Sequence, residues 1–389
     1  MAKDRMSRQP GDEVPGRWPS DLNPRKLRVC FVLAYRAPDY VRGRSIIEAL
    51  QRLEDVDLIL AVNRHKGVGR YLDMLLQLVR TRKATDPDLY ILGFRGHEAA
   101  WLVRWLTRGK PLVFDAMMSP YAALSTEGKA GWIGRMLAPL WRGYEKAILH
   151  GADMVLTDTA LHAAYYAHEF DLATADILPL PVGAIERPVP AEAPRQAAAD
   201  DTFRVLFYGS FLPLHGVDCI LHAAMQLTDL PIEFRFVGGT AAQGRKLRKA
   251  CDAAGIRRYS HARWIPLERL LCDEIPRADL CLGGPFGGTP QARRVVTGKS
   301  LQCLALARAT VIGRIDEDCG FLDRVNCLLV DQADATALAN AIRWGYANRD
   351  KLPSIGRQGQ LLYARRFSID VIASRLMPAL LNLVTKHAT

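Results

Sequence analysis

Groups that could bind a phosphate gather where the second half of the chain begins, in the stretch RVLFYGSFLPLHGVDCILHAA at residues 204–224. Its first apolar run is short enough for a buried parallel strand. Gly209 and Ser210 break that strand, and His215 and Gly216 precede apolar residues at helical spacing. A strand, a glycine turn and a helix N-terminus predict an anion site, because unpaired backbone N–H groups and the helix dipole point to the same crevice.

Three further loops of the second half would meet this turn at one edge of a parallel sheet. Gly238 and Gly239 follow an expected strand, and paired glycines allow a ligand to approach the backbone closely. Trp264 and Ile265 end another expected strand, where their backbone could pair with a nucleobase edge. The fourth loop, GGPFGGTPQARRVVTGK, carries Thr289, Arg293, Arg294 and Lys299 just before an expected helix.

Glycines, two arginines, a lysine and a helix start together suit a diphosphate, because arginine forks and backbone N–H groups share its charge. Each loop taken alone is typical of an ordinary turn in a parallel sheet. All four in sheet order favour a nucleotide-diphosphate site.

The elements that must position these loops alternate between strand and helix in both halves of the chain. Strands are expected at 27–34, 56–62, 88–93, 111–114, 153–157 and 177–180, and again at 205–208, 233–237, 262–265, 280–282, 310–312 and 327–330. Amphipathic segments between them predict helices, and Asp334 is placed to cap one of these. The pattern predicts an α/β protein with two Rossmann-like, doubly wound parallel-sheet domains that face a cleft.

The domain organisation follows from where this alternation stops and restarts. We expect a disordered lead-in at 1–25, a first domain at 26–185 and a linker at 186–202, since the lead-in and the linker are rich in proline and charge without periodicity. A second domain is expected at 203–360. Terminal helices at 361–389 are expected to pack back on the first domain.

Composition narrows the class of protein. The chain has 389 residues, of which 49% are hydrophobic and 24% charged, as in soluble proteins with two sizeable cores. Its eight cysteines form no CxxC pair, which favours reduced core thiols over zinc or disulfides. There is no secretory signal, Walker A motif, NAD fingerprint or HExxH motif. We therefore expect a cytoplasmic protein without a metal or another cofactor.

Positive charge is concentrated in the first half of a chain whose formal net charge is +11. The segment 64–83 holds six basic residues and one acid, and Trp101 and Trp105 lie near Arg104, Arg108 and Lys110. Such surfaces can contact an anionic membrane, here the inner face of the cell membrane. The alternative is a core-facing apolar stripe with solvated basic residues. Nucleic acid is not an expected partner, because no reading motif accompanies the charge.

At this point the chain resembles a retaining glycosyltransferase of the GT-B fold, family-4 type. The resemblance spans residue 27 to the C-terminus. It is carried by YGSFLPLHGVD at 208–218, by WIP at 264–266 with ADLCLG at 278–283, by Phe286-Gly287 with KSLQCLA at 299–305, by ADMVLT at 152–157 and by Phe367-Ser368 before a long helix.

The resemblance implies donor-binding roles for the second-domain loops, with some departures from the family pattern. Ser210 and His215 stand where the family has a basic pair, Gln302 stands at its ribose-binding glutamate, and Pro285 replaces a second glutamate. We hypothesise that Arg293, Arg294 and Lys299 supply the charge that Ser210 and His215 do not. Gln302 can still hydrogen-bond a ribose hydroxyl.

For the first domain, the resemblance implies that Arg42 and Gly43 lie in a loop near the donor phosphate and that Asp115 faces the reacting sugar. The expected strand ends point Ser119 and Thr159 to the same cleft, so these residues form the expected acceptor side. Asp115, Arg294 and Lys299 are the candidate catalytic residues. The alternative for Asp115 is a helix cap or turn aspartate. In a retaining transfer the departing diphosphate can take the acceptor proton, while positive groups stabilise its charge.

The implied function is transfer of a sugar from a nucleotide-diphosphate sugar to the hydroxyl of a saccharide, a lipid-linked glycan or a small molecule. The main alternative is a catalytically idle protein of this fold that binds a nucleotide sugar or a partner protein. A nucleotide-sugar epimerase of the same double fold is a third interpretation, and the missing carboxylates count against it.

Overall fold

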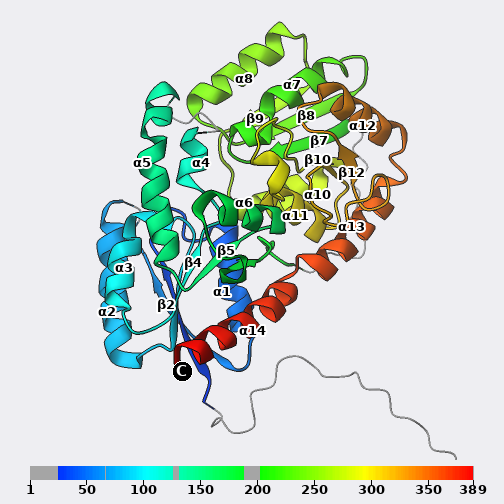
Figure 1. Ribbon diagram of the computed structural model, residues 1–389. Coiled ribbons are helices and arrows are strands. Elements are labelled where there is room, and N and C mark those ends of the chain that lie inside the picture. Colours follow the sequence, from blue (N-terminus) through cyan, green and yellow to red (C-terminus); the bar gives the residue numbers. More distant parts are fainter. Residues whose placement is uncertain (1–24, 66, 126–130, 188–201, 389) are drawn as a thin grey trace, which may run out of the picture.

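The computed structural model describes residues 25–65, 67–125, 131–187 and 202–388, so the expected lead-in and most of the expected linker lie outside the described residues. Two α/β domains sit one above the other, and the chain runs from the first to the second and back (Figure 1). Each domain contains one six-stranded sheet in which all pairings are parallel. The predicted fold class is confirmed.

The first sheet has the strand order β2-β1-β3-β4-β5-β6. Its strands are β1 (Leu27–Leu33), β2 (Val56–Val62), β3 (Leu89–Leu92), β4 (Leu112–Asp115), β5 (Met154–Thr157) and β6 (Ile177–Pro179). Alternate residues of β1 enter different cores: Val29, Phe31 and Leu33 pack against the helices of one face, and Cys30 and Val32 against those of the other. Burial on both faces explains why these strands read as continuous apolar runs.

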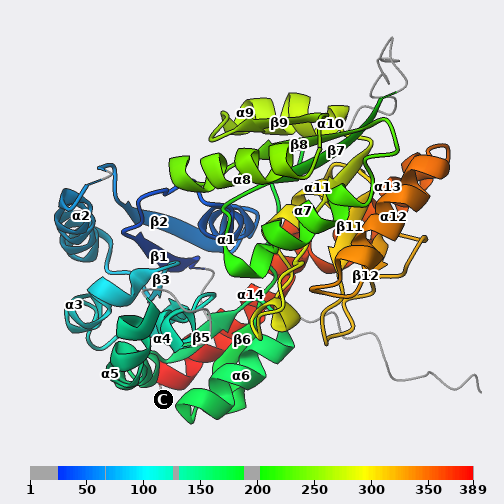
Figure 2. The same ribbon diagram turned by 90° about the horizontal axis from the view of Figure 1, so that it is seen from above.

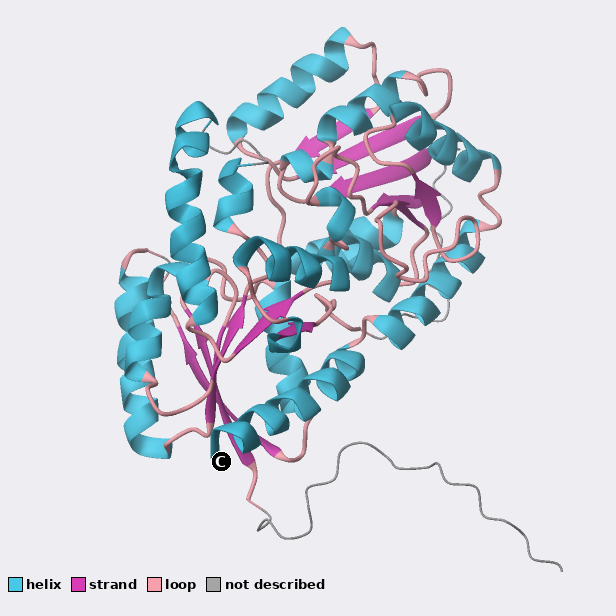
Figure 3. Cartoon of the chain, viewed as in Figure 1, coloured by secondary structure: helices cyan, strands magenta, loops and turns pink. Residues whose placement is uncertain are grey.

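Helices cover both faces of the first sheet. One face carries α2 (Gly69–Thr85), α3 (Ala100–Leu106), α5 (Gly131–His150) and α6 (Ala160–Phe170), and the other carries α1 (Val41–Gln51) and the terminal α14 (Ile369–Ala388). A short α4 (Pro120–Ser125) packs against α5. The cartoon in Figure 3 shows this layering around the first sheet.

The second sheet has the order β12-β11-β10-β7-β8-β9. Its strands are β7 (Phe203–Tyr208), β8 (Ile232–Val237), β9 (Tyr259–Ala262), β10 (Leu280–Leu282), β11 (Thr310–Gly313) and β12 (Leu328–Val330). The direction of winding reverses between β7 and β10, and ligands of open α/β sheets bind outside the carboxyl ends of the strands at such a switch point.

The helices of the second domain are α7 (Val217–Met225), α8 (Ala241–Ala253), α11 (Gly298–Ala305) and α12 (Ala335–Ala347), with α9 (Leu267–Arg269) and α10 (Ile275–Arg277) joined by a π-helical turn. Strand β9 ends earlier than the sequence suggested. Ala262 pairs with Val237, the last residue of β8, so the ladder has no partner strand beyond it. Trp264 and Ile265 consequently lie in the loop that follows the strand.

The C-terminal helices connect the two domains. Helix α13 (Leu352–Arg366) packs against α11, and α14 continues from it to pack on α1. Residues 352–388 are the one helical stretch in the described part of the chain with the length and composition to span a membrane, but half of its most apolar window is buried in the protein. Ile372, Leu376 and Leu380 belong to the core of the first domain, as expected of a packed amphipathic helix.

Candidate functional site

The glycine turns after β7 and β8 touch each other. Gly209 and Gly238 have φ angles of +130° and +125°, which other residues rarely adopt. A Cβ atom at position 238 would overlap the carbonyl oxygen of Gly209. Gly239, at +78°, lies against the ring of Phe211. The two turns therefore form one close-packed backbone surface at the carboxyl edge of the sheet.

The loops after β7 and β10 are interlocked in the same way. A Cβ at Gly216 would overlap the backbone between Phe286 and Gly287, and a Cβ at Gly287 would overlap the carbonyl oxygen of Pro213. The backbone N–H of Gly287 donates to the Leu214 carbonyl at 3.0 Å. Phe286 is buried in the core of the second domain. The predicted convergence of these loops at the switch point is what the structure shows.

Lys299 brings a positive charge to this surface. It is the second residue of α11, whose N-terminus is capped by the hydroxyl of Thr297. Its Cδ lies 3.1 Å from the position that a Cβ on Gly209 would take, and its Nζ is 5.5 Å from the centre of the Phe207 ring. No hydrogen bond or ion pair joins Nζ to another residue in the described part of the chain. Burial lowers the pKa of Lys299 to about 7.

His215 and Ser210 complete this group. A ring nitrogen of His215, Nδ1, pairs with the carbonyl oxygen of Ser210. Burial, followed by the charge of Lys299, lowers the pKa of His215 to about 3, so its imidazole is neutral at physiological pH. One titratable lysine, a neutral histidine and two helix N-termini, those of α7 and α11, thus face the same turn. This arrangement can hold an anionic group with a single side-chain cation.

The two arginines of the long loop are engaged elsewhere. The guanidinium carbon of Arg294 lies 3.8 Å from the centre of the Tyr165 ring on α6, and its carbonyl oxygen accepts a hydrogen bond from the Thr159 hydroxyl. Arg293 is exposed and 3.6 Å from Asp316. In this structure the loop therefore ties the second domain to the first, and neither arginine adds its charge to the turn at Gly209.

Gln302 also differs from the expectation. Its Oε1 accepts from the backbone N–H of Ile185 at 2.9 Å, and its Nε2 donates to the Ile185 carbonyl at 3.0 Å. The side chain is 6% exposed. Its amide is occupied by the chain leaving the first domain, because that segment packs along α11, and it does not reach a ribose in this structure.

Asp115 and Arg42 form a buried ion pair, so the expectation that they face the cleft does not hold. Both side chains have no exposed surface, and the Arg42 Nε is 3.1 Å from each Asp115 oxygen. The remaining Arg42 nitrogens donate to the carbonyls of Leu180, Pro181 and Thr157. Arg42 thus holds together three strand ends of the first sheet, with Gly43 packed against Phe31 and Leu33 beside it.

The remaining predicted residues act as caps or stand at the surface. Ser119 is buried and donates to Glu145 at 2.9 Å, and Thr159 caps α6 by accepting from the His162 N–H. Thr289 accepts from the Ala292 N–H. Trp264 is 76% exposed beside the loop of Ile265 and could stack on a flat ligand.

A cavity of about 300 Å³ lies between the domains, where the sequence predicted a cleft. Thr159 lines it, together with Asp158 and Glu317, which were not singled out from the sequence. Asp158 is buried 2.6 Å from the ring of His162 behind it, and Glu317 of the second domain accepts from the Leu161 N–H of α6. The signal was an aspartate and a histidine four residues apart at a helix start. The Leu161–Glu317 and Thr159–Arg294 hydrogen bonds make the start of α6 a polar contact between the two domains.

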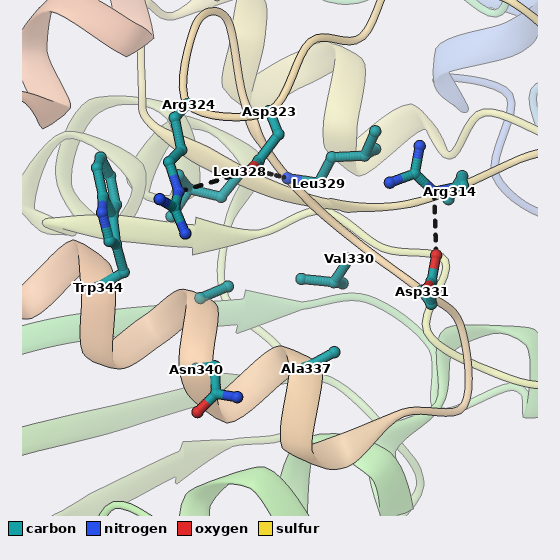
Figure 4. Close-up of a pocket in the computed structure, with 11 residues that line it drawn as sticks. Arg314, Asp323, Arg324, Leu328, Leu329, Val330, Asp331, Ala337, Asn340 and Trp344 are labelled. Carbon is teal, nitrogen blue, oxygen red and sulfur yellow. Dashed lines mark hydrogen bonds and ion pairs between the residues drawn. The ribbon is translucent and has the colours of Figure 1, made fainter.

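A second cavity, of about 180 Å³, lies between β12 and α12 (Figure 4). Arg314 pairs with Asp331 at its rim, and Arg324 stacks over Trp344 at 4.9 Å. No lining residue belongs to the glycine turns, so this cavity is separate from the switch-point site. Among the described residues, no cluster of histidine, cysteine and acidic side chains could hold a metal ion.

Comparison with known proteins decides the fold name. No protein-family model and no curated protein sequence matches the chain. Sucrose-phosphate synthase from Thermosynechococcus elongatus superimposes with a TM-score of 0.70 at 16% identity, covering 93% of this chain and 100% of that one. HepE from Anabaena, solved with UDP and glucose, gives 0.66 at 14% identity, covering 92% and 100%. The chain has the GT-B fold.

A lipopolysaccharide outer core galactosyltransferase, WaaB, matches over 91% of this chain and 99% of its own, with a TM-score of 0.57 and 12% identity. The match to complete chains of this kind means that both domains and the crossover helix share the GT-B arrangement. The start of α11, next to Lys299, lies against the first domain, because a Cβ on Gly298 would meet the side chains of Val41 and Val182.

Proposed function

We propose that the protein is a glycosyltransferase that moves a sugar from a nucleotide-diphosphate sugar to an acceptor hydroxyl with retention and without a metal. The observation that carries this proposal is Lys299, the second residue of α11, packed behind Gly209, whose carbonyl touches Gly238. His215, just before the start of α7, pairs with Ser210 of the same turn. Backbone N–H groups and one ammonium there could hold a diphosphate and stabilise the charge that develops as the sugar leaves.

The donor is proposed to be a uridine diphosphate sugar. HepE, which shares the fold over its entire length, was solved with UDP-glucose. The exposed indole of Trp264 and the loop of Ile265 supply a surface on which a base could stack. A thermal-shift panel of UDP, GDP, ADP and dTDP sugars tests this choice, since a ligand that binds only the native state raises its melting temperature. No shift with any of them would refute a donor site.

Arg293 and Arg294 remain proposed diphosphate ligands for a conformation in which their loop leaves α6. The test is Arg294→Ala, with Arg293→Ala measured in parallel. If Arg294 grips the diphosphate, donor affinity falls at least about tenfold, as for a lost charge-assisted hydrogen bond. Unchanged affinity would leave Arg294 with only its contact to Tyr165.

The second candidate is a catalytically idle protein that binds a nucleotide sugar. It is favoured because the Gln302 amide is bound to the backbone of Ile185 and Asp115 is bound in a buried pair with Arg42. Donor hydrolysis separates the two candidates. Slow release of UDP from one sugar nucleotide supports a transferase, whereas tight binding without any turnover supports the idle protein. The protein is proposed to act in the cytoplasm, at the inner face of the membrane.

A further inference from the structure

Helix α5 exposes an unusual amount of apolar surface. Its N-terminal half carries Trp132, Ile133, Met136, Leu137 and Leu140, which are between 40% and 72% exposed. Their spacing places them along one side of the helix, and the opposite side is buried through Gly134 and Ala138. The small residues already seat α5 on the domain, so its large side chains have no role in that packing.

The neighbouring helices extend this apolar face. Trp101, Leu102 and Trp105 of α3 and Leu72 and Leu76 of α2 are between 44% and 63% exposed. The Tyr144 hydroxyl of α5 donates to the His97 carbonyl just before α3, and Arg82 of α2 donates to the Arg108 carbonyl just after it. Figure 2 shows α2, α3 and α5 along one side of the first domain. Large exposed apolar side chains that gather on one side of a soluble protein mark a contact surface for a partner or a membrane.

The exposed half of α5 lies on the side of the first sheet where its strands end, the side that faces the second domain and is here called the cleft mouth. Helix α4, which packs on α5, follows the carboxyl end of β4, and α5 then runs back toward the start of β5. The beginning of α5 is therefore on the cleft side of the sheet. In Figure 1 it reaches the level of α8 in the second domain. A surface that covered α5 would lie next to this cleft mouth.

Basic residues border the apolar face. Arg80 and Lys83 of α2, Arg108 after α3 and Arg135 of α5 are exposed, and none forms an ion pair with a residue that the structure describes. A second copy of the chain docked through the same face would bring these like charges together. An anionic bilayer would attract them, and tryptophans favour its interfacial region.

We infer that α2, α3 and α5 dock this protein on an anionic lipid surface, and that its acceptor is an amphiphile held in that surface with its hydroxyl at the cleft mouth. The docking stands on the exposed side chains alone. The acceptor class rests on the proposed transferase function. A lipid-borne acceptor would meet the cleft without leaving the bilayer, because the exposed half of α5 and the cleft mouth would touch the same surface.

Co-sedimentation with vesicles tests the docking. The probes are equimolar phosphatidylglycerol–phosphatidylcholine vesicles and vesicles of phosphatidylcholine alone. The full chain should bind the anionic vesicles and bind less as salt is raised. The triple variant Trp132→Ser, Met136→Ser, Leu140→Ser should bind at least about tenfold more weakly, because it lacks three apolar side chains that the bilayer would bury. The control variant Met225→Ser, Leu322→Ser, Leu361→Ser removes exposed apolar side chains elsewhere and should bind normally.

Thermal unfolding of both triple variants establishes that they are folded. Equal binding by the α5 variant and the wild type, or no binding to anionic vesicles, would overturn the docking. So would a wild-type dimer that the α5 variant converts to a monomer, because the face would then serve a second copy.

The acceptor class is tested by measuring the release of nucleotide diphosphate from the donor with and without the phosphatidylglycerol vesicles. A total lipid extract is mixed into these vesicles as the source of acceptors. Faster release with lipid, lost in the α5 variant, supports the inference. Release stimulated equally by a water-soluble sugar overturns the acceptor class. A donor-induced thermal shift is measured without vesicles, so its absence would refute the proposed function while leaving the docking intact.

Discussion

The side-chain amide of Gln302 makes both of its hydrogen bonds with the backbone of a single residue, Ile185, 117 positions earlier in the chain. The same segment is held by Tyr363 of α13, whose hydroxyl accepts from the Ala184 N–H and donates to Glu186. Arg52 and Ile369 of the first-domain side also bind Glu186. The passage between the domains is thus fixed by polar contacts from both of them.

Gln302→Glu should destabilise the fold. A carboxylate cannot donate to the Ile185 carbonyl, so two acceptors would face each other in a buried position, at a cost of about 1–3 kcal/mol in the free energy of unfolding. Urea unfolding measures it, with Gln51→Glu at an exposed helix end as the control, expected within about 0.5 kcal/mol of wild type. A gain in donor affinity without loss of stability would instead place residue 302 at the ribose.

Gly238→Ala should disrupt the paired glycine turns. The new Cβ would overlap the Gly209 carbonyl and would also require a strained φ of +125°. Gly255→Ala is the matched control, since Gly255 has a φ of +69° but open space around it. We expect Gly238→Ala to cost more than the roughly 1 kcal/mol of strain at Gly255, and to abolish the donor-induced thermal shift. Equal effects of the two substitutions would argue against close packing of the turns.

Donor binding should take up a proton above neutral pH. Lys299 has a pKa of about 7 in the folded protein, and a bound diphosphate would favour its charged form. Donor affinity should therefore fall as the pH rises from 7 to 9. Calorimetry at pH 8 in two buffers of different ionisation enthalpy measures the uptake, which Lys299→Met should remove and Lys249→Met, at an exposed site, should preserve.

The same lysine sets a stability trend of defined sign. Its pKa is lowered from an ordinary value of 10.5, so between about pH 7 and 10.5 the unfolded chain binds more protons than the native one. Raising the pH through this window should stabilise the wild type relative to Lys299→Met. The opposite slope in urea unfolding midpoints would mean that Lys299 is charged and paired in the native state.

Asp115→Ala should act on folding. It would leave the fully buried Arg42 guanidinium without its counter-ion, which costs about 3–5 kcal/mol in the free energy of unfolding. Asp273→Ala removes an exposed partner of Arg277 and should cost less than about 1 kcal/mol. Urea unfolding decides between the two roles of Asp115, because a stable variant without turnover would return it to the catalytic residues.

Local patterns of the sequence determined the two wound sheets and the glycine turns. Burial on both faces makes parallel strands apolar throughout, and only glycine tolerates the φ angles at positions 209 and 238. These signals lie within a few residues of one another and need no knowledge of distant partners. The turns therefore met at the switch point as the order of the strands required.

Only the tertiary structure decided what the polar side chains contact. Arg42 finds Asp115 and Leu180, and Arg294 finds Tyr165, across separations that no local pattern encodes. Arg42 meets its partners because β4, β5 and β6 end side by side in the first sheet, and Arg294 meets Tyr165 because the two domains pack together. A buried charge or amide must take the hydrogen-bonding groups that packing places beside it. Of the three predicted cations, Arg293, Arg294 and Lys299, it is Lys299 that lies beside the turn at Gly209, because α11 begins behind that glycine.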